Sequence, residues 1–247
     1  MKDQQKAHPQ AASQSAATSR SELIFGDSTG DISADLSEDQ VLGLLHQSGL
    51  NAALLASIAR TPIAAKSRKV SIALLRHQRL PRHLSIALLR RLFTFDLVKV
   101  ALSPVIAPDL KRIAEEQILL RLESLPLGER ISLARRSPPR VLEGLLADGD
   151  GRVLSAALAN SRLRESSLVA VLRRGQAPAI LFESVSRHST WSERREVQIA
   201  LLGSEKTPIA WAKRFAMRFP PQILEDIMPQ SRRYLAGMDR SLPPHDL

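Results

Sequence analysis

Residues 74–92, LLRHQRLPRHLSIALLRRL, contain the pattern from which the fold is predicted. An apolar pair closes one amphipathic segment, four residues follow, and Leu80-Pro81 begins the next segment. The leucines at positions 84, 88 and 92 recur at the i, i+4, i+8 spacing of one helix face, whereas apolar residues of a strand would alternate with polar ones. This stretch therefore predicts two short helices joined by a turn.

The same turn recurs along the chain. In each copy an apolar pair ends one segment, four residues follow, and a small or apolar residue begins the next, usually with proline behind it. The apolar pairs are Leu74-Leu75, Ala101-Leu102, Val171-Leu172 and Leu201-Leu202, with less regular copies at Leu133-Ala134 and Ala157-Leu158. Recurrence about every 25–31 residues is typical of an α-helical solenoid, in which stacked units bury faces that one unit cannot bury alone. The alternative is an irregular all-α bundle.

Short polar motifs predict where helices begin. Ser37-Glu38-Asp39-Gln40 is a capping box, in which the first side chain binds a backbone N–H and the last reaches back. Thr190-Trp191-Ser192-Glu193 predicts a second one. Thr61-Pro62 and Thr207-Pro208 each predict a capping threonine with proline at the first helical position.

The ends of the chain differ from the repeats in composition. Residues 1–36 are rich in Gln, Ala and Ser and then in acids, with too few apolar residues to offset chain entropy, so we expect a disordered acidic tail. The α-helical repeat domain is expected over residues 37–228. Residues 229–247, which contain two adjacent prolines, form the predicted C-terminal tail.

Residues 188–219, HSTWSERREVQIALLGSEKTPIAWAKRFAMRF, resemble a HEAT-like or leucine-rich-repeat-variant unit. The matching positions are Val197, Ala200, Leu201, Gly203, Thr207 and Pro208, and in residues 151–172 they are Arg152, Val153, Ala156, Ala157, Asn160 and Leu163. Residues 67–89 match more weakly, and the resemblance covers about residues 50–225. It implies a right-handed α-solenoid used as a binding surface. The N-terminal cysteine cluster of some family members has no counterpart, because this chain contains no cysteine.

Charge is distributed unevenly over the 247 residues, which hold 35 basic and 25 acidic side chains and a net charge of +10. Residues 1–40 carry three basic and seven acidic residues, whereas residues 41–247 carry 32 and 18. No Asp or Glu occurs between Val41 and Phe95, where nine basic residues lie. Such a block attracts anions, and the candidates are nucleic acid, an acidic protein and an anionic membrane.

The predicted binding patch lies within this block, at the turns of the pattern quoted above. It comprises Arg76, Arg79, Arg82, His83, Arg90 and Arg91. We expect it to bind an acidic or phosphorylated protein, and the alternative is salt-sensitive binding to the nucleic-acid backbone. A plain composition bias also competes, since Arg outnumbers Lys 27 to 8. A further hypothesis is that the acidic tail lies on the patch of its own chain.

Catalysis is not expected. Without cysteine the chain has no thiol chemistry, and no Walker, dinucleotide-binding, G-x-S-x-G or H-E-x-x-H motif occurs. Asp148-Gly149-Asp150-Gly151 lacks the later ligands of a calcium loop and is interpreted as a turn between helices. We therefore predict no metal and no cofactor.

The aromatic residues bear on two other functions. A HEAT-like DNA repair glycosylase is a remote alternative, for which only Trp191, Trp211 and Tyr234 could serve beside a damaged base. Phe93 and Phe95 are expected in the core, which counts against base stacking at the patch.

The sequence predicts neither secretion nor a membrane span. The N-terminal residues have no apolar core of a signal peptide, and the longest uncharged run, Val41–Ala59, is interrupted by polar residues at its centre. A cytoplasmic location is therefore expected, with no prediction of oligomeric state.

Overall fold

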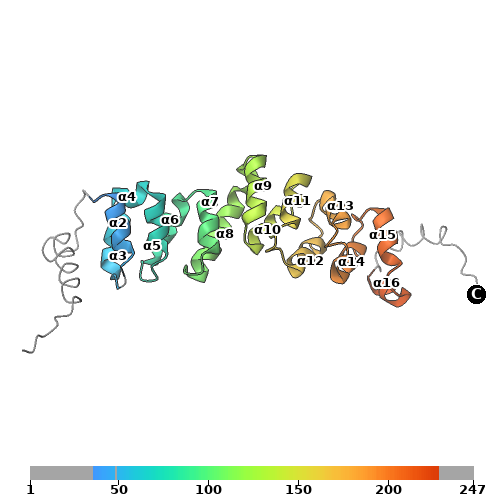
Figure 1. Cartoon of the computed structure of the whole chain (residues 1–247). Helices are drawn as coiled ribbons and strands as arrows, with labels where there is room; N and C mark the ends of the chain where they lie inside the picture. Colours follow the sequence, from blue (N-terminus) through green and yellow to red (C-terminus); the bar gives the residue numbers. More distant parts are fainter. Residues whose placement is uncertain (1–35, 48, 228–247) are drawn as a thin grey trace, which may run out of the picture. The chain divides into compact units, whose positions relative to one another are not determined.

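All regular elements in the part of the chain that the structure describes are helices (Figure 1). The structure is a computed structural model and describes residues 36–47 and 49–227. The predicted all-α class is confirmed for these residues, whereas the predicted tails, 1–36 and 229–247, lie outside them apart from Leu36. Within the same ranges, no helix is long and apolar enough to cross a bilayer.

The chain divides into two compact units, Met1–Ala114 and Glu115–Leu247, and the division falls within helix α8, Pro108–Arg121. The other helices of the first unit are α2 (Glu38–Leu45), α3 (Ala52–Arg60), α4 (Pro62–Lys66), α5 (Arg68–Leu75), α6 (Arg82–Arg91) and α7 (Thr94–Leu102). Helix α5 packs against α2 and α7, and α3, α4 and α6 also contact it. Leu55 and Leu74 are fully buried among them.

The second unit begins after α8 with the short 3-10 helix η1 (Leu122–Ser124). Its α-helices are α9 (Leu127–Arg136), α10 (Pro139–Leu145), α11 (Gly151–Leu158), α12 (Glu165–Arg173), α13 (Ala179–Arg187), α14 (Arg195–Leu202), α15 (Ile209–Ala216) and α16 (Pro221–Ile227). Alternate helices pack together: α11 contacts both α9 and α13, and α12 contacts both α10 and α14. Leu142 and Phe182 are fully buried in this unit. Consecutive helices thus fall into two packed rows.

Two of the predicted helix starts are confirmed. The Ser37 N–H donates to Gln40 Oε1 at 2.8 Å, and the Gln40 N–H donates to Ser37 Oγ at 3.3 Å, which completes the capping box of α2. Thr61 Oγ1 accepts from the Ala64 N–H at 3.3 Å, and Pro62 is the first residue of α4. Each cap satisfies a backbone donor that has no partner inside the helix.

Three of the recurrent turns are closed by the same backbone hydrogen bond. The donor and acceptor residues are Leu80 and His77, Leu163 and Asn160, and Thr207 and Ser204, with distances of 3.0–3.2 Å. The donor residue is buried each time. A small or apolar residue recurs at this position because it enters the core between two helices.

The proline behind that residue opens the helix in two of these turns, at Pro108 of α8 and Pro139 of α10, and precedes the helix in three others. Pro81, Pro178 and Pro208 are the N-caps of α6, α13 and α15, with φ between −54° and −68° and ψ near 140°. The pyrrolidine ring imposes this φ, so these caps hold their geometry without a side-chain hydrogen bond. The prediction that Thr207 caps α15 was wrong, because Pro208 occupies the N-cap position of that helix. Thr207 is buried, and its hydroxyl donates to the Leu201 carbonyl at 2.6 Å.

Residues 190–193 form a turn and not the predicted capping box, because α14 begins only at Arg195. The acceptor at this turn is His188, whose Nδ1 lies 3.2 Å from the backbone N of Thr190 and 3.4 Å from that of Trp191. A ring nitrogen that accepts must be unprotonated. Burial, which disfavours the charged ring, lowers the pKa of His188 below its usual value of 6.5.

Acidification should destabilise the second unit through His188. Because its folded-state pKa lies below 6.5, the unfolded chain takes up the proton first, and stability falls as the pH drops below 6.5. In His188→Asn, the Oδ1 atom supplies an acceptor that does not titrate there, so the loss should be smaller. Urea denaturation at about pH 7.5 and about pH 5.5, on either side of the ordinary histidine pKa, measures the difference. An equal loss in both proteins would contradict this role.

Candidate functional site

Side chains at the turns donate to carbonyl oxygens of an earlier helix end or turn. The bonds run from His77 Nε2 to Leu45 (2.9 Å), Asn160 Nδ2 to Ala134 (2.8 Å), Trp191 Nε1 to Leu158 (2.8 Å) and Lys206 Nζ to Ala177 (2.7 Å). Their partners are 26 to 33 residues apart in the chain. Since the last carbonyls of a helix lack partners within it, these bonds fix each turn against an earlier segment.

Carboxylates neutralise a large part of the arginine excess. Ion pairs join Arg68 to Asp96 (3.7 Å), Arg82 to Asp109, Arg140 to Glu116 (3.3 Å), Arg174 to Glu143 (3.6 Å) and Arg218 to Glu193 (2.7 Å). The arginine of each pair is more than a third exposed, so each pair contributes little stability. Arginines that are paired with a carboxylate are poor candidates for binding an anion, so the candidate site depends on arginines that are not paired in this way.

Many arginines of the chain, whether or not a carboxylate pairs with them, lie in the last turns of helices. They are Arg60 in α3, Arg90 and Arg91 in α6, Arg135 and Arg136 in α9, Arg173 in α12 and Arg187 in α13. Cations stabilise this end of a helix, where unpaired carbonyls give a partial negative charge. Part of the arginine bias in the composition thus has a structural origin.

The structure brings two residues of the predicted patch into one pocket. Arg76 and Arg82 line a pocket of about 310 Å³ beside α5 and α6, together with His77 and Asp109. Asp109 pairs with Arg82, whereas Arg76 is exposed and has no side-chain partner in the described part of the chain. Arg76 therefore supplies the uncompensated positive charge at this pocket.

The other residues of the predicted patch lie elsewhere on the first unit. Arg79 is directed to the α2–α3 turn, where its Nη1 lies 3.5 Å from the Leu50 carbonyl. His83 is exposed in the first turn of α6. Arg90 and Arg91 end the same helix, eight or nine residues beyond Arg82, which corresponds to about 12–13 Å along the axis. The six residues thus form two groups. The first group, Arg76, Arg79, Arg82 and His83, lies before or at the start of α6, and the second group, Arg90 and Arg91, lies at its end.

Phe93 is 64% exposed, so the expectation that it lies in the core was wrong. It is the N-cap of α7 and has extended backbone angles, which direct it out of the helical stripe that ends at Leu92. The guanidinium carbon of Arg68 lies 5.3 Å from the centre of its ring. The partner of Arg68 is the buried Asp96, which also accepts from Lys99 at 2.9 Å. An exposed ring with a stacked cation therefore stands beside the second group of patch residues.

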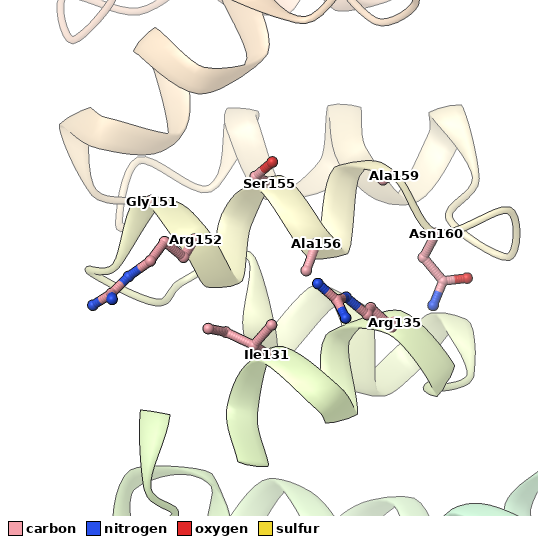
Figure 2. Close-up of a pocket in the computed structure, with 8 residues that line it drawn as sticks. All are labelled: Ile131, Arg135, Gly151, Arg152, Ser155, Ala156, Ala159 and Asn160. Carbon is pink, nitrogen blue, oxygen red and sulfur yellow. The ribbon is translucent and has the colours of Figure 1, made fainter. Parts of the chain in front are cut away.

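The second unit contains a groove of about 550 Å³ between α9 and α11, which the sequence did not predict (Figure 2). Ile131 and Arg135 line it from α9, and Gly151, Arg152, Ser155, Ala156, Ala159 and Asn160 line it from α11 and the following turn. The small side chains on α11 leave this space open. Figure 2 shows the Arg135 guanidinium directed toward Ala156, while Arg152 extends away at the other end of α11.

The two arginines that line this groove differ in whether a carboxylate neutralises their charge. Arg152 donates to both carboxylate oxygens of Asp150, from Nε at 3.1 Å and from Nη2 at 2.9 Å. These hydrogen bonds are the main reason that the pKa of Asp150 falls to about 2. Arg135 is exposed and has no side-chain partner among the described residues. An anion entering the groove therefore meets one uncompensated charge, at Arg135.

The Asp148–Gly151 segment forms the predicted turn. Asp148 accepts from Arg130 Nη1 at 2.6 Å and from the Asp150 N–H at 2.9 Å, and Asp150 is the N-cap of α11. Both carboxylates are thus engaged within the protein. In the described ranges, no three His, Asp or Glu side chains lie close enough together to hold a metal ion.

The sequence contains a signal for the groove of the second unit, but this signal is weaker than the acid-free block from which the binding patch was predicted. Residues 130–142 and 151–164 contain no Asp or Glu, yet each stretch is far shorter than the acid-free block at 41–95. Local spacing also gives no indication that α9 and α11 are neighbours. Comparison of the chain with protein-family models, curated proteins and solved structures found no match.

Proposed function

We propose that this chain is a non-catalytic binding scaffold of the cytoplasm, a right-handed α-solenoid that binds an acidic or phosphorylated protein. The packing of alternate helices within each unit and the hydrogen bonds between turns 26–33 residues apart support the solenoid. In such an array the turns of one row of helices lie along a common edge. Side chains at the turns are therefore positioned to contact an extended partner.

The observation that carries this proposal is the placement of Arg76. It is exposed, no carboxylate among the described residues pairs with it, and it lines the same pocket as His77 and Arg82. A guanidinium group binds a carboxylate or phosphate through two parallel hydrogen bonds. Asp109 holds the Arg82 side chain at the pocket, and the His77 bond to the Leu45 carbonyl fixes the turn. The site is thus preorganised around one available cation.

Charge reversal at Arg76 tests the proposed function. In Arg76→Glu, affinity for a fluorescein-labelled peptide that alternates phosphoserine with leucine should fall at least about tenfold, since a charge-assisted contact is replaced by repulsion. Arg60→Glu is the matched control. It reverses an exposed arginine of the same unit that lies outside the pocket and has no side-chain partner in residues 36–47 and 49–227, and it should weaken binding less than about twofold at physiological salt. Equal losses in the two variants, measured by fluorescence anisotropy, would contradict a specific site.

Backbone-directed nucleic-acid binding is the second candidate, and the exposure of Phe93 favours it. A base can stack on the exposed ring of Phe93. Phosphates could then contact Arg68, whose guanidinium lies over the ring, and Arg91, which is two residues away in the sequence. If this candidate holds, Phe93→Ala should weaken binding to single-stranded RNA about tenfold and leave the phosphopeptide affinity unchanged. If Arg76→Glu weakens phosphopeptide binding and leaves RNA binding unchanged, the result favours the protein partner.

A further inference from the structure

Four arginines lie in the two segments that meet at one end of the groove between α9 and α11, and one of them, Arg135, lines the groove itself. Arg135 and Arg136 end α9, and Arg162 and Arg164 lie in the turn that follows α11. All four are exposed, and none has a side-chain partner in the described ranges of the chain. We call these residues the second arginine cluster. It belongs entirely to the second unit and shares no residue with the predicted patch.

The buried Asn160 side chain holds the cluster together. Its Nδ2 donates to the Ala134 carbonyl at 2.8 Å, and its Oδ1 accepts from the Arg162 N–H at 2.8 Å. One carboxamide thus connects the end of α9 to the turn that carries Arg162. The backbone positions of the arginines are therefore fixed before any ligand binds, which lowers the entropic cost of binding.

The electrostatic environment of the cluster favours an anion. The partial negative charge at the end of α9 opposes it, but Asn160 already occupies the Ala134 carbonyl, and four guanidinium groups outnumber that charge. Helix α12 begins directly after Arg164 without a side-chain cap, so its partial positive end faces the same turn. The nearest carboxylate in sequence, Glu165, lies 3.9 Å from Arg194.

We propose that the second arginine cluster and the α9–α11 groove form a binding site for a phosphorylated segment of a protein. The phosphate would lie on the cluster, since arginine clusters bind the three oxygens of a phosphate through paired hydrogen bonds. An adjacent apolar side chain would enter the groove over Ile131 and Ala156. Helix α11 has eight residues and is about 12 Å long, which matches about four residues of extended chain.

The lining of the groove favours a peptide over a nucleic acid. None of the residues that line it is aromatic, so a base has no ring on which to stack. Its surface is instead formed by small and aliphatic side chains between two arginines, one compensated by Asp150 and one not. A chain with one dianionic group next to an apolar side chain complements that pattern.

The test measures binding of the labelled phosphoserine–leucine peptide to the full chain by anisotropy, with the unphosphorylated peptide and single-stranded RNA as comparisons. Arg135→Ala should weaken phosphopeptide binding about tenfold, because one charge-assisted contact is lost. Ala159→Phe, at an exposed position on the groove, should weaken it as much without changing the charge. Arg60→Ala, the matched control, removes an exposed arginine in the last turn of α3 that also has no side-chain partner among the described residues, and should weaken binding less than about twofold.

Two outcomes would overturn the proposal. Equal effects of Arg135→Ala and Arg60→Ala would mean attraction by overall charge alone. Loss of RNA binding together with an inert Ala159→Phe would assign the cluster to nucleic acid. Repeating the series in chains that also carry Arg76→Glu separates this site from the one in the first unit. If Arg135→Ala still weakens phosphopeptide binding in the Arg76→Glu background, the result supports a site in the α9–α11 groove even if Arg76 itself binds nothing.

Discussion

Replacing Phe182 by alanine should lower the free energy of unfolding of the second unit by about 3–5 kcal/mol. Phe182 lies in α13, which packs against α11, and its side chain is fully buried. Its removal loses the transfer free energy of the ring and leaves a cavity that surrounding helices fill only in part. Urea denaturation followed by tryptophan fluorescence measures this change, because Trp191 and Trp211 both lie in the second unit.

Phe93→Ala is the matched control, since it removes the same side chain from an exposed position. It should change the free energy of unfolding of the first unit by less than about 0.5 kcal/mol, measured by circular dichroism. A loss of several kcal/mol in Phe93→Ala would mean that Phe93 is buried in solution, as the sequence had suggested. A small loss in Phe182→Ala would contradict the packing of α13.

Asn160→Ala should destabilise the second unit by about 2–4 kcal/mol. The substitution leaves the Ala134 carbonyl without its partner at a buried position, which costs about 1–3 kcal/mol, and it removes the part-buried hydrogen bond of the Arg162 N–H, which contributes about 1 kcal/mol. The loss should appear in the tryptophan-detected transition. Phosphopeptide affinity should fall in the same variant, because the turn that carries Arg162 is released.

Ser161→Ala controls for Asn160→Ala. Ser161 is the next residue of the turn and is exposed, and its hydroxyl makes no hydrogen bond within the described part of the chain. We expect a change of less than about 0.5 kcal/mol in the free energy of unfolding. If both variants lose the same small amount, the carboxamide does not join the two segments in solution.

Local sequence patterns predicted the helices and their turns because the turn is encoded within eight residues. The apolar pair before it and the buried residue after it, such as Leu163, are set by packing, and the pattern recurs wherever two helices meet. Proline was misplaced by one position in α6, α13 and α15 but not in α4, α8 and α10, since its fixed φ suits the N-cap as well as the first helical turn. Phe93 was misplaced because an N-cap residue no longer follows the period of the helix before it.

The candidate sites were predictable only in part. Acid-free stretches indicated where cations gather, but the ion pairs that neutralise Arg82 and Arg140 join residues 27 and 24 apart. Such partners depend on which helices become neighbours, and local spacing carries no information about that. The groove between α9 and α11 has the same origin: its arginine and its small residues come from segments that only the fold brings together.

The central claim is that two exposed arginines without a carboxylate partner in the described part of the chain, Arg76 in the first unit and Arg135 in the second, bind phosphorylated protein segments. Isothermal titration calorimetry of the full chain with the phosphoserine–leucine peptide tests it most directly through the stoichiometry. The account predicts two peptides per chain, one after Arg76→Glu and one after Arg135→Glu. No binding, or a stoichiometry that neither substitution changes, would contradict it.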